Sequence, residues 1–500
     1  MNFARDVVDA APPERLALVE LRRDGGRREW RFGEVADGAA RLAGTLVRCG
    51  AGRGDVVMTL VGNRPEWVLT MVACFRIGAV VLPCTEQLRA RDLRLRLDAA
   101  RPRLVVCDER NAAELQAARP DCPVLVVPDP SLFNGPPVAA AELDPGDPCL
   151  ITFTSGTAGE PKGVLHAQRY LGGQALQAER WLAAQPGDLV WCTAASGWSK
   201  SARNVFIAPW LRGAAALLHD QRFDPHERLE LLARERVDVL CMAPTEYRVI
   251  AKRATLGPLP RLRGLVAAGE ALNPEVLRVW EEATGLSIRD GYGQTETGQL
   301  TGAPLGEPVR PGSMGRPLPG VGLRVDDGEL VVDPATVPTF FLGYLGDRAD
   351  AAPRSPLVPE RSVALDVPDR RSTGEPWRTG DRVRQDDDGW LFFEGRTDDV
   401  IISAGYRIGP FEVESALVAH PAVAEAAVVA APDEERGAIV RAVVVLRDGA
   451  DPSDRLVAEL QEHVKRETAP YKYPRRIDFA DELPKTSSGK VRRALLRAGG

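Results

Sequence analysis

Residues 56–63 read VVMTLVGN, residues 65–78 read PEWVLTMVACFRIG and residues 79–84 read AVVLPC. Two short runs rich in valine and leucine therefore enclose one helix-length apolar stretch, and β-rich runs at 103–108 and 123–129 continue the alternation. Such alternation is typical of a doubly wound α/β sheet. It resumes at 149–154, 188–194, 215–220, 238–244 and 262–269. We therefore predict an α/β fold with two doubly wound layers, one after the other along the chain.

The chain beyond residue 290 changes character. Glycine and proline turns separate alternating segments such as 322–332 (GLRVDDGELVV), which favours hairpins and a small β-barrel-like region. Regular periodicity fades between 334 and 375, and the structure of that stretch is left open. From residue 400 onward, two helical segments and two β runs predict a compact α+β module of about 100 residues.

The composition of the chain excludes several classes of function. The 500 residues have a net charge of −6 and no basic stripe interleaved with aromatics, which argues against nucleic-acid binding, and no apolar run reaches the ~20 residues of a membrane span. The eight cysteines form no CxxC pair and the five histidines no HxxxH pair, so we expect no zinc site. The N-terminus contains early acids and no apolar core, unlike a secretory signal. We expect a cytoplasmic protein that acts on small molecules.

The β-rich segment 149–154 runs into a loop of glycines and hydroxyls that ends in a lysine. The loop reads SGTAGEPKG from Ser155 to Gly163. Its glycines allow the backbone to approach an anion, Ser155 and Thr157 offer hydroxyl donors, and Lys162 supplies positive charge. The Walker pattern GxxxxGK[ST] is absent. Taken alone, the loop is as compatible with an ordinary turn as with phosphate binding.

Two further clusters and the C-terminal tail suit a nucleotide. In residues 290–297 (DGYGQTET), Tyr292 has a ring that can stack on a base and Glu296 a carboxylate that can hold Mg²⁺. In residues 377–399, Asp381 suits the two hydroxyls of a ribose and Arg396 a phosphate or ribose oxygen. Lys490, at the end of PKTSSGK, can neutralise charge on a phosphoryl group and an attacking carboxylate. Each cluster taken alone also fits a solvated polar segment.

Together, the four segments resemble the adenylate-forming superfamily of acyl-CoA synthetases, nonribosomal-peptide adenylation domains and luciferases. The resemblance covers almost the whole chain, with the segments in the order of that superfamily. Segments 197–214, 291–298, 400–417 and 471–490 are most similar to medium-chain acyl-CoA synthetases and their acetyl-CoA synthetase relatives. The resemblance implies an N-terminal adenylate-forming domain at 1–396, a hinge at 397–399 and a C-terminal α+β domain at 400–500.

The resemblance implies an AMP-forming ligase that works in two half-reactions. A carboxylate attacks the α-phosphorus of Mg-ATP to give an acyl adenylate, and a thiol, that of coenzyme A, then displaces AMP. In the family, the C-terminal domain swings between these steps about a hinge that maps onto Asp398. The implied cofactors are ATP, Mg²⁺ and coenzyme A.

The resemblance also assigns roles to individual residues. It implies catalytic roles for Lys490, Thr154, Glu296 and Lys162, with Glu296 also holding Mg²⁺. The residues implied to contact the nucleotide are Ser155, Gly156, Thr157, Gly269, Glu270, Ala271, Asp290, Gly291, Tyr292, Gln294, Thr295, Asp381 and Arg396. The residues implied to approach the coenzyme A thiol are Gly405, Tyr406 and Arg407.

The acyl pocket determines which acid is used. Acetate-selective relatives have a tryptophan where Gly293 stands, so the resemblance implies a deeper pocket for an acid larger than acetate, a medium-chain fatty acid first. We expect Trp198 on the pocket wall, with ordinary core packing as its alternative. An aryl or specialised-metabolite acid stays open, as do an adenylation enzyme that loads an acyl carrier protein and a homodimeric assembly.

Overall fold

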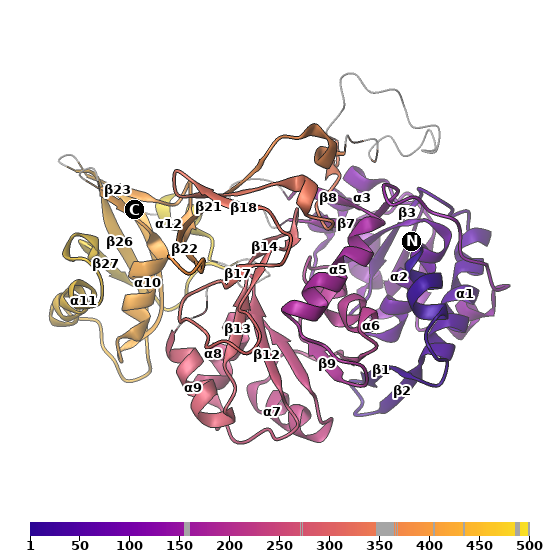
Figure 1. Ribbon diagram of the computed structural model, residues 1–500, viewed down its shortest axis with the longest axis horizontal. Helices are drawn as coiled ribbons and strands as arrows, with labels where there is room; N and C mark the ends of the chain where they lie inside the picture. Colours follow the sequence, from indigo (N-terminus) through magenta and orange to yellow (C-terminus); the bar gives the residue numbers. More distant parts are fainter. Residues whose placement is uncertain are drawn as a thin grey trace.

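The structure of the protein is a computed structural model that describes residues 1–154, 161–270, 272, 274–346, 365, 367, 369–403, 406–433, 436–485 and 491–498. It has the predicted α/β architecture: a large N-terminal part holds two α/β sheets and an antiparallel region, and a small C-terminal part follows. Figure 1 shows the first sheet at the right, the second sheet toward the bottom and the yellow C-terminal elements at the left.

The first sheet has seven strands in the order β20-β8-β7-β4-β3-β5-β6. Strands β3 to β7 run parallel, as a doubly wound sheet requires, and β8 and β20 add antiparallel partners at one edge. Pro65 opens helix α2 and Gly78 ends it at φ +73°, which sets the limits of this apolar helix. The elements are β3 (Val56–Leu60), α2 (Pro65–Ile77), β4 (Val80–Cys84), α3 (Ala90–Ala100), β5 (Leu104–Asp108), α4 (Ala112–Ala117), β6 (Val124–Val127), β7 (Pro148–Phe153), β8 (Gly163–Ala167) and β20 (Gly343–Tyr344).

The second sheet has the order β13-β12-β11-β9-β10-β1-β2. Six of its strands run parallel, and only β2 pairs antiparallel, with β1. Strand β1 comes from the start of the chain, so the first residues complete a sheet whose other parallel strands lie about 200 residues later. The elements are β1 (Leu16–Leu21), β2 (Arg27–Arg31), β9 (Leu189–Cys192), β10 (Ala215–His219), α7 (Pro225–Arg234), β11 (Val239–Met242), α8 (Pro244–Arg253), β12 (Gly264–Ala268), α9 (Pro274–Thr284) and β13 (Ile288–Gly291).

One hydrophobic core joins the two sheets. It contains side chains of both sheets together with those of the helices between them, and Trp67 of α2 meets Phe206 edge to face at 5.7 Å. This packing makes the two layers one unit and leaves their strand ends side by side. The helices that contribute are η1 (Ala4–Asp9), α1 (Phe32–Arg48), α5 (Arg169–Arg180), η4 (Arg203–Ile207) and α6 (Ala208–Leu211).

The antiparallel region predicted after residue 290 is present. Its largest sheet has the order β18-β19-β21-β22. Asp327 and Gly328 form the turn between β18 and β19 with φ +47° and +77°, as expected of a tight hairpin with an Asp-Gly turn. Its strands are β14 (Gly293–Gln294), β15 (Gly298–Gln299), β16 (Thr301–Gly302), β17 (Arg316–Pro317), β18 (Leu323–Asp326), β19 (Glu329–Val332), β21 (Trp377–Gln385) and β22 (Leu391–Arg396).

The C-terminal module has its own hydrophobic core. Strands β25, β26 and β27 form one sheet, β23 and β24 a hairpin, and Lys252 of α8 donates to the carbonyl of Ala424 at 2.8 Å. The elements are β23 (Ile401–Ser403), β24 (Tyr406–Ile408), α10 (Pro410–Ala419), β25 (Val423–Asp433), β26 (Gly437–Leu446), α11 (Asp454–Glu467), β27 (Arg476–Phe479) and α12 (Arg493–Ala498). Within the described ranges, no helix has the length and apolar character needed to cross a membrane.

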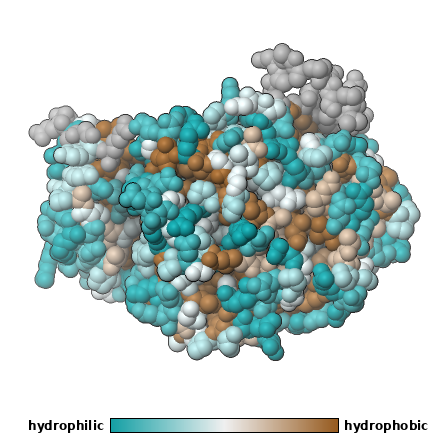
Figure 2. Space-filling view, in the orientation of Figure 1, coloured by the Kyte–Doolittle hydropathy of each residue, from teal (hydrophilic) through white to brown (hydrophobic). Residues whose placement is uncertain are grey.

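The surface differs between the middle and the ends of the molecule. Figure 2 shows hydrophobic residues gathered toward the middle of this face, where Figure 1 places β14 and β18, and hydrophilic residues over the C-terminal end. The less polar surface therefore lies close to the region that contains the predicted site.

Candidate active site

Residues that the sequence assigns to the nucleotide meet around the carboxylate of Asp381. Tyr292 follows β13 and Gln294 lies in β14, whereas Asp381 and Arg396 come from β21 and β22. The Tyr292 hydroxyl and Gln294 Nε2 donate to Asp381 Oδ2 at 2.5 and 2.8 Å. Arg396 Nη1 donates to Asp381 Oδ1 at 3.2 Å. Both carboxylate oxygens are therefore held by protein donors.

The charges of this cluster support one another. Burial raises the pKa of Tyr292 well above its usual value and the charge of Asp381 adds to the shift, so the hydroxyl stays a donor. Burial opposes the charge on Arg396, but Asp381 and Asp398 outweigh it and raise the pKa of Arg396. A carboxylate offers about four acceptor positions, and these donors take three of them. Binding both hydroxyls of a ribose therefore requires one protein donor to move aside.

Gln294 is fixed from two sides. Its Nε2 also donates to the Thr379 carbonyl at 2.7 Å, and its Oε1 accepts from Trp377 Nε1 at 3.1 Å. Thr379 and Trp377 both belong to β21, the strand that contains Asp381. Strand β21 thus orients both the carboxylate and the amide that binds it.

A second group of predicted residues is joined through Tyr344. Glu296 Oε1 accepts from the Tyr344 hydroxyl at 2.8 Å, and the Lys162 ammonium lies 5.2 Å from the centre of the Tyr344 ring. The pairing of β20 with β8 places Tyr344 opposite Val164, two residues after Lys162 in the chain. The Thr154 amide donates to the Lys162 carbonyl at 2.9 Å and closes the base of the phosphate loop. Three of the predicted catalytic residues, Thr154, Lys162 and Glu296, are thereby connected.

The oxygen donors of this group suit Mg²⁺. Glu296 offers a carboxylate and Thr154 a hydroxyl, and hard oxygen ligands are those that Mg²⁺ prefers. No set of three or more His, Cys, Asp or Glu side chains in the part of the chain that the structure describes could hold a metal ion. A magnesium ion at Glu296 would therefore complete its shell with phosphate oxygens and water, as is usual for this ion.

Several predicted residues lie outside the described residues. They are Ser155, Gly156, Thr157, Ala271, Gly405 and Lys490, and the side chain of Arg407 is likewise not described. Their described neighbours fix where these segments start and end: Thr154 and Lys162 enclose the phosphate loop, and Lys485 and Val491 form a β-bridge at either side of the tail.

The remaining residues predicted to contact the nucleotide lie at the ends of β12 and β13. Gly269 has φ +101°, a conformation that favours glycine, and Glu270 Oε2 accepts from Thr245 Oγ1 at 2.6 Å. Asp290 is buried, which raises its pKa well above the usual value, and its Oδ1 accepts from the Gly291 amide. These residues lie at the carboxyl ends of parallel strands, the edge at which α/β sheets bind ligands.

His166 supports the nucleotide motif from beneath. It lies buried in β8, close to the backbone of Thr295, and packs its ring against that of Tyr170 at 4.1 Å. Burial, and then the charges of Arg203 and Arg169, lower the pKa of His166 to about 3. The imidazole is therefore neutral at physiological pH.

Comparison with known proteins identifies the family. Residues 5–344 match the family of AMP-binding enzymes, and residues 412–490 match the AMP-binding enzyme C-terminal domain. The chain belongs to the AMP-binding enzyme family. This agrees with the resemblance drawn from the four motifs.

The AMP-binding enzyme has relatives along its full length. It is 39% identical to the mitochondrial acyl-coenzyme A synthetase ACSM4 of Rattus norvegicus, over 99% of this chain and 90% of the relative. It superposes on the anthranilate CoA ligase AuaEII in complex with anthranoyl-AMP with a TM-score of 0.86 at 27% identity, covering 99% and 96% of the two chains. For ATP-bound MatB from Rhodopseudomonas palustris the TM-score is 0.84 at 27% identity, covering 100% and 98%. The predicted class, an AMP-forming acyl-CoA ligase, is confirmed.

The AMP-binding enzyme contains a cavity of about 630 Å³ next to Glu270 and Thr245. Trp198, which was predicted to lie on the wall of the acyl pocket, is one of the residues that line this cavity, and its contact with an acyl group stays a prediction. Lys200, another lining residue, donates to the Ala268 carbonyl at 3.2 Å and so ties the wall to the end of β12. Pockets for substrate-sized ligands have volumes of about 300–1,000 Å³, so this cavity can hold an organic acid of appreciable size.

Gly293, which was predicted to leave the floor of the acyl pocket open, lies in β14 against β15. An added Cβ would be 1.9 Å from the Gly298 carbonyl oxygen. The absent side chain is therefore required by a neighbouring backbone, and among the described residues it is Trp198 and its neighbours that line the large cavity. Its role at the acyl pocket stays a prediction.

The predicted hinge and coenzyme A residues lie on the C-terminal side. Asp398 Oδ1 accepts from Arg396 Nε at 3.4 Å, so the hinge position is coupled to the Asp381 cluster. Tyr406 is 51% exposed and stacks on Tyr471 of the same module at 4.3 Å. In this arrangement Tyr406 is accessible to a ligand in solution.

Sequence reasoning missed Tyr344, Thr245 and Asn204. Tyr344 and Thr245 contact Glu296 and Glu270 across long sequence separations, and no local motif marks either residue. Asn204 lies within the segment 197–214 that indicated the acyl-CoA synthetase branch, yet its significance depends on its burial in η4 beside the cavity. A polar residue inside an otherwise apolar run was the only available signal.

Proposed function

We propose that this enzyme activates a carboxylic acid larger than acetate, with medium-chain fatty acids first, as an acyl adenylate, and then transfers the acyl group to coenzyme A. The observation that supports this choice is the cavity of about 630 Å³ beside Trp198 and Glu270, which is far larger than acetate needs. The likeness to the medium-chain branch along the full chain supports it as well.

In the first half-reaction, a carboxylate oxygen forms a bond to the α-phosphorus of ATP and pyrophosphate leaves. Asp381 and Arg396 hold the ribose side of the nucleotide, and Tyr292 lies beside the base. Lys162 and Lys490 neutralise negative charge on the phosphates, and the Thr154 hydroxyl orients them. A magnesium ion held by Glu296 would supply further charge neutralisation at the leaving phosphates.

In the second half-reaction, the sulfur of coenzyme A forms a bond to the acyl carbonyl carbon and AMP leaves, while the thiol proton passes to solvent. The chain prepares this step by moving the C-terminal module about Asp398, which would bring Gly405, Tyr406 and Arg407 to the thiol. Since Asp398 contacts Arg396, this movement is coupled to release of the ribose cluster.

An aryl acid is the second candidate for the acyl substrate. The likeness to a ligase solved with anthranoyl-AMP, at 0.86 TM-score, supports it. A carrier protein in place of coenzyme A is the second candidate for the acceptor.

The test is pyrophosphate release from the purified protein with Mg-ATP across linear, branched and aromatic acids, with and without coenzyme A. We expect release with an acid of medium length or greater and conversion of that acid to its coenzyme A thioester. Release without any thioester would favour a carrier protein as acceptor. Acetate as the best acid, or no release with any acid, would contradict the proposal.

A further inference from the structure

The wall of the large cavity contains a lysine whose ammonium group is not paired with a carboxylate. Lys200 is partly buried and lines this cavity, and its Nζ donates to the Ala268 carbonyl at 3.2 Å. Within the ranges that the structure describes, Lys200 forms no ion pair. A lysine ammonium has three donors, so two remain for a ligand once the Ala268 carbonyl has taken one.

Other charged groups of the cavity wall already have partners. Glu270 accepts from a threonine hydroxyl at 2.6 Å, and Arg228 pairs with Glu246 at 3.4 Å. The charge of Lys200 acts on Asp290, but burial raises the pKa of that carboxyl well above its usual value and so weakens it as a counter-charge. A partly buried ammonium without a counter-charge attracts an anion. The cavity therefore favours an anionic group of a ligand beside Lys200.

The turn that contains Lys200 is held firmly. Gly197 has φ +87°, and a Cβ there would overlap the amide nitrogen of Thr85, so the turn packs directly against the backbone that follows β4. The Ser201 hydroxyl donates to the Trp198 carbonyl at 2.7 Å. The backbone around Lys200 therefore has a fixed place, and the hydrogen bond to β12 then orients the ammonium.

The hydrogen bond to Ala268 places the ammonium at the end of the cavity that adjoins the predicted nucleotide residues. Ala268 is the last residue of β12, and a Cβ added at the next residue, Gly269, would lie 3.4 Å from Lys200 Nζ. Across the strand pair, Ala268 lies opposite Gly291 of β13, which Tyr292 follows. Gly269, Gly291 and Tyr292 are all predicted to contact the nucleotide. The ammonium therefore lies where the cavity meets the predicted nucleotide site.

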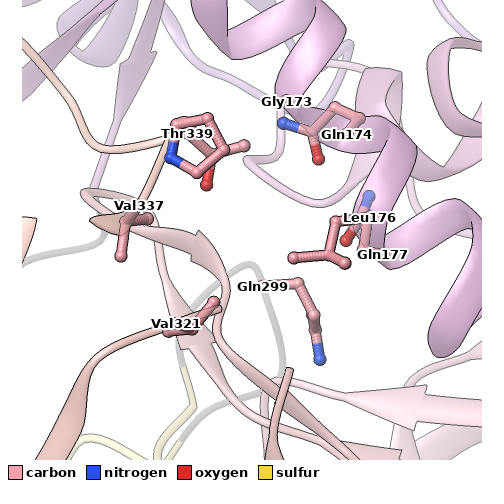
Figure 3. Close-up of a pocket in the computed structure, with 9 residues that line it drawn as sticks. Gly173, Gln174, Leu176, Gln177, Gln299, Val321, Val337 and Thr339 are labelled. Carbon is pink, nitrogen blue, oxygen red and sulfur yellow. The ribbon is translucent and has the colours of Figure 1, made fainter. Parts of the chain in front are cut away.

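A second cavity does not compete for the acid. It has a volume of about 10 Å³ and lies between α5 and the segment that contains Thr339. Figure 3 shows the side chains of Gln174, Gln177 and Gln299 beside it. A space of this size holds about one water molecule. Of these two cavities, only the larger one can hold an organic acid.

We propose that Lys200 binds the reacting carboxylate of the acid before adenylation and orients it toward the nucleotide. The reacting carboxylate is the one part of the acid that must meet the α-phosphorus, and it is an anion until it reacts. The ammonium takes one carboxylate oxygen and leaves the other free to form the bond to phosphorus. Formation of the acyl adenylate removes the negative charge and ends the ion pair. The inference rests on the proposed function and assigns a substrate-binding residue to that same site.

Loss of the ammonium should weaken binding of the acid and not of ATP. Lys200→Met removes the charge from a side chain of similar length. We expect KM for the acid to rise by about tenfold or more, because a charge-assisted hydrogen bond is lost, with KM for ATP nearly unchanged. Lys200→Arg keeps the charge and should retain most of the binding. Lys465→Met, the same exchange at a local ion pair of α11, should change neither KM.

The experiment measures ATP–pyrophosphate exchange with octanoic, octanedioic and benzoic acids, which reports adenylation without any thiol acceptor. Calorimetry then compares octanoate with octanamide, and benzoate with benzamide, because each amide has the shape of the acid without its charge. In the wild type, the carboxylate should bind about tenfold or more tightly than its amide. In Lys200→Met the two should bind about equally, and affinity for the amide should be nearly that of the wild type.

An unchanged KM for the acid in Lys200→Met, or equal losses of carboxylate and amide binding, overturns the inference while the proposed function stands. A rise in KM for ATP alone would place the ammonium on a phosphate, and a loss confined to octanedioic acid would place it on a second carboxylate. Either result overturns the inference too. If Lys200→Met does not fold, Lys200→Gln, which keeps a donor without the charge, serves in its place with the same expected rise in KM. Exchange by the wild type with none of the three acids contradicts the proposed function, and the inference then falls with it.

Discussion

The two sides of the active site are built in opposite ways. On the nucleotide side, the carboxylate of Asp381 is satisfied by Tyr292, Gln294 and Arg396 even without a ligand. Beside the large cavity, Asn204 and Arg203 are buried and have side-chain atoms without a hydrogen-bond partner within the described part of the chain. The difference shows that the polar groups of the predicted nucleotide cluster hold one another in place before a ligand binds, although one donor must move aside for a ribose, whereas buried groups beside the large cavity keep atoms without a partner among the described residues.

The largest loss of activity is expected when the hydrogen-bonded Asp381 cluster is disrupted. Asp381→Asn removes the charge that Arg396 and the Tyr292 hydroxyl bind, and leaves a partly buried cation without its partner. We expect kcat/KM for ATP in pyrophosphate exchange to fall by about 100-fold or more. Asp326→Asn removes an exposed ion pair with Arg378 and should change little. Equal losses in the two variants would contradict a preorganised site.

The residues predicted to contact the nucleotide could be singled out from the sequence because they sit in short motifs, and four of them meet in the structure. Tyr292 and Gln294 are two positions apart, and Asp381 is the last residue of the recognisable segment WRTGD, so residue type and order sufficed. The sequence did not predict the buried amide pair beside the large cavity. Asn204 and Gln177 lie 27 residues apart on two packed helices, and no local sequence motif marks either amide. Burial, not residue type, makes them significant.

The fold shows the same limit. The strand and helix alternation from residue 56 onward predicted both α/β sheets, since each element has a local pattern. Strands β1 and β2 were not predicted, because β1 is placed by pairing with β10 almost 200 residues later. Gly293 is a further example. A side chain at this position would meet the Gly298 carbonyl across the β14–β15 pair, and no sequence motif indicates that contact.

A second prediction tests that contact. Gly293→Ala places a methyl group against the Gly298 carbonyl, so the β14–β15 pair must separate. We expect a loss of about 1–3 kcal/mol in the free energy of unfolding, with weaker ATP binding because Tyr292 and Gln294 flank the site. Denaturant unfolding measures the loss. Gly257→Ala, at a glycine with open space around it, is the control. An unchanged Gly293→Ala protein would show that the β14–β15 pair accommodates a side chain at this position.

The buried His166 should give the protein a pH-dependent stability. His166 stays neutral in the folded state down to a pKa of about 3, whereas its ordinary pKa is 6.5. Between these values the unfolded state binds more protons, so stability falls as pH falls. At pH 5 this one residue should lower the free energy of unfolding by about 2 kcal/mol relative to neutral pH. Asparagine cannot titrate, so between neutral pH and pH 5 the free energy of unfolding of His166→Asn should fall by about 2 kcal/mol less than that of the wild type. Parallel plots of unfolding free energy against pH for the two proteins would exclude His166 as a cause.

The smallest effect is expected for Thr245, which orients Glu270 between the predicted adenine site and the large cavity. The experiment asks whether Thr245 only positions Glu270 or takes part in the reaction. Thr245→Val keeps the shape of the side chain but removes the hydroxyl that donates to Glu270 at 2.6 Å. Glu270 adjoins both the predicted adenine site and the large cavity, so a loosened carboxylate should disturb both. One lost hydrogen bond to a charged group is worth about 1.5–3 kcal/mol at most and about 1 kcal/mol when water replaces the donor. We therefore expect KM for ATP to rise about fivefold with kcat nearly unchanged, because the hydroxyl touches neither reacting atom. A drop in kcat instead would place Thr245 in the reaction itself, and the nucleotide side would then depend on groups beyond its preorganised cluster.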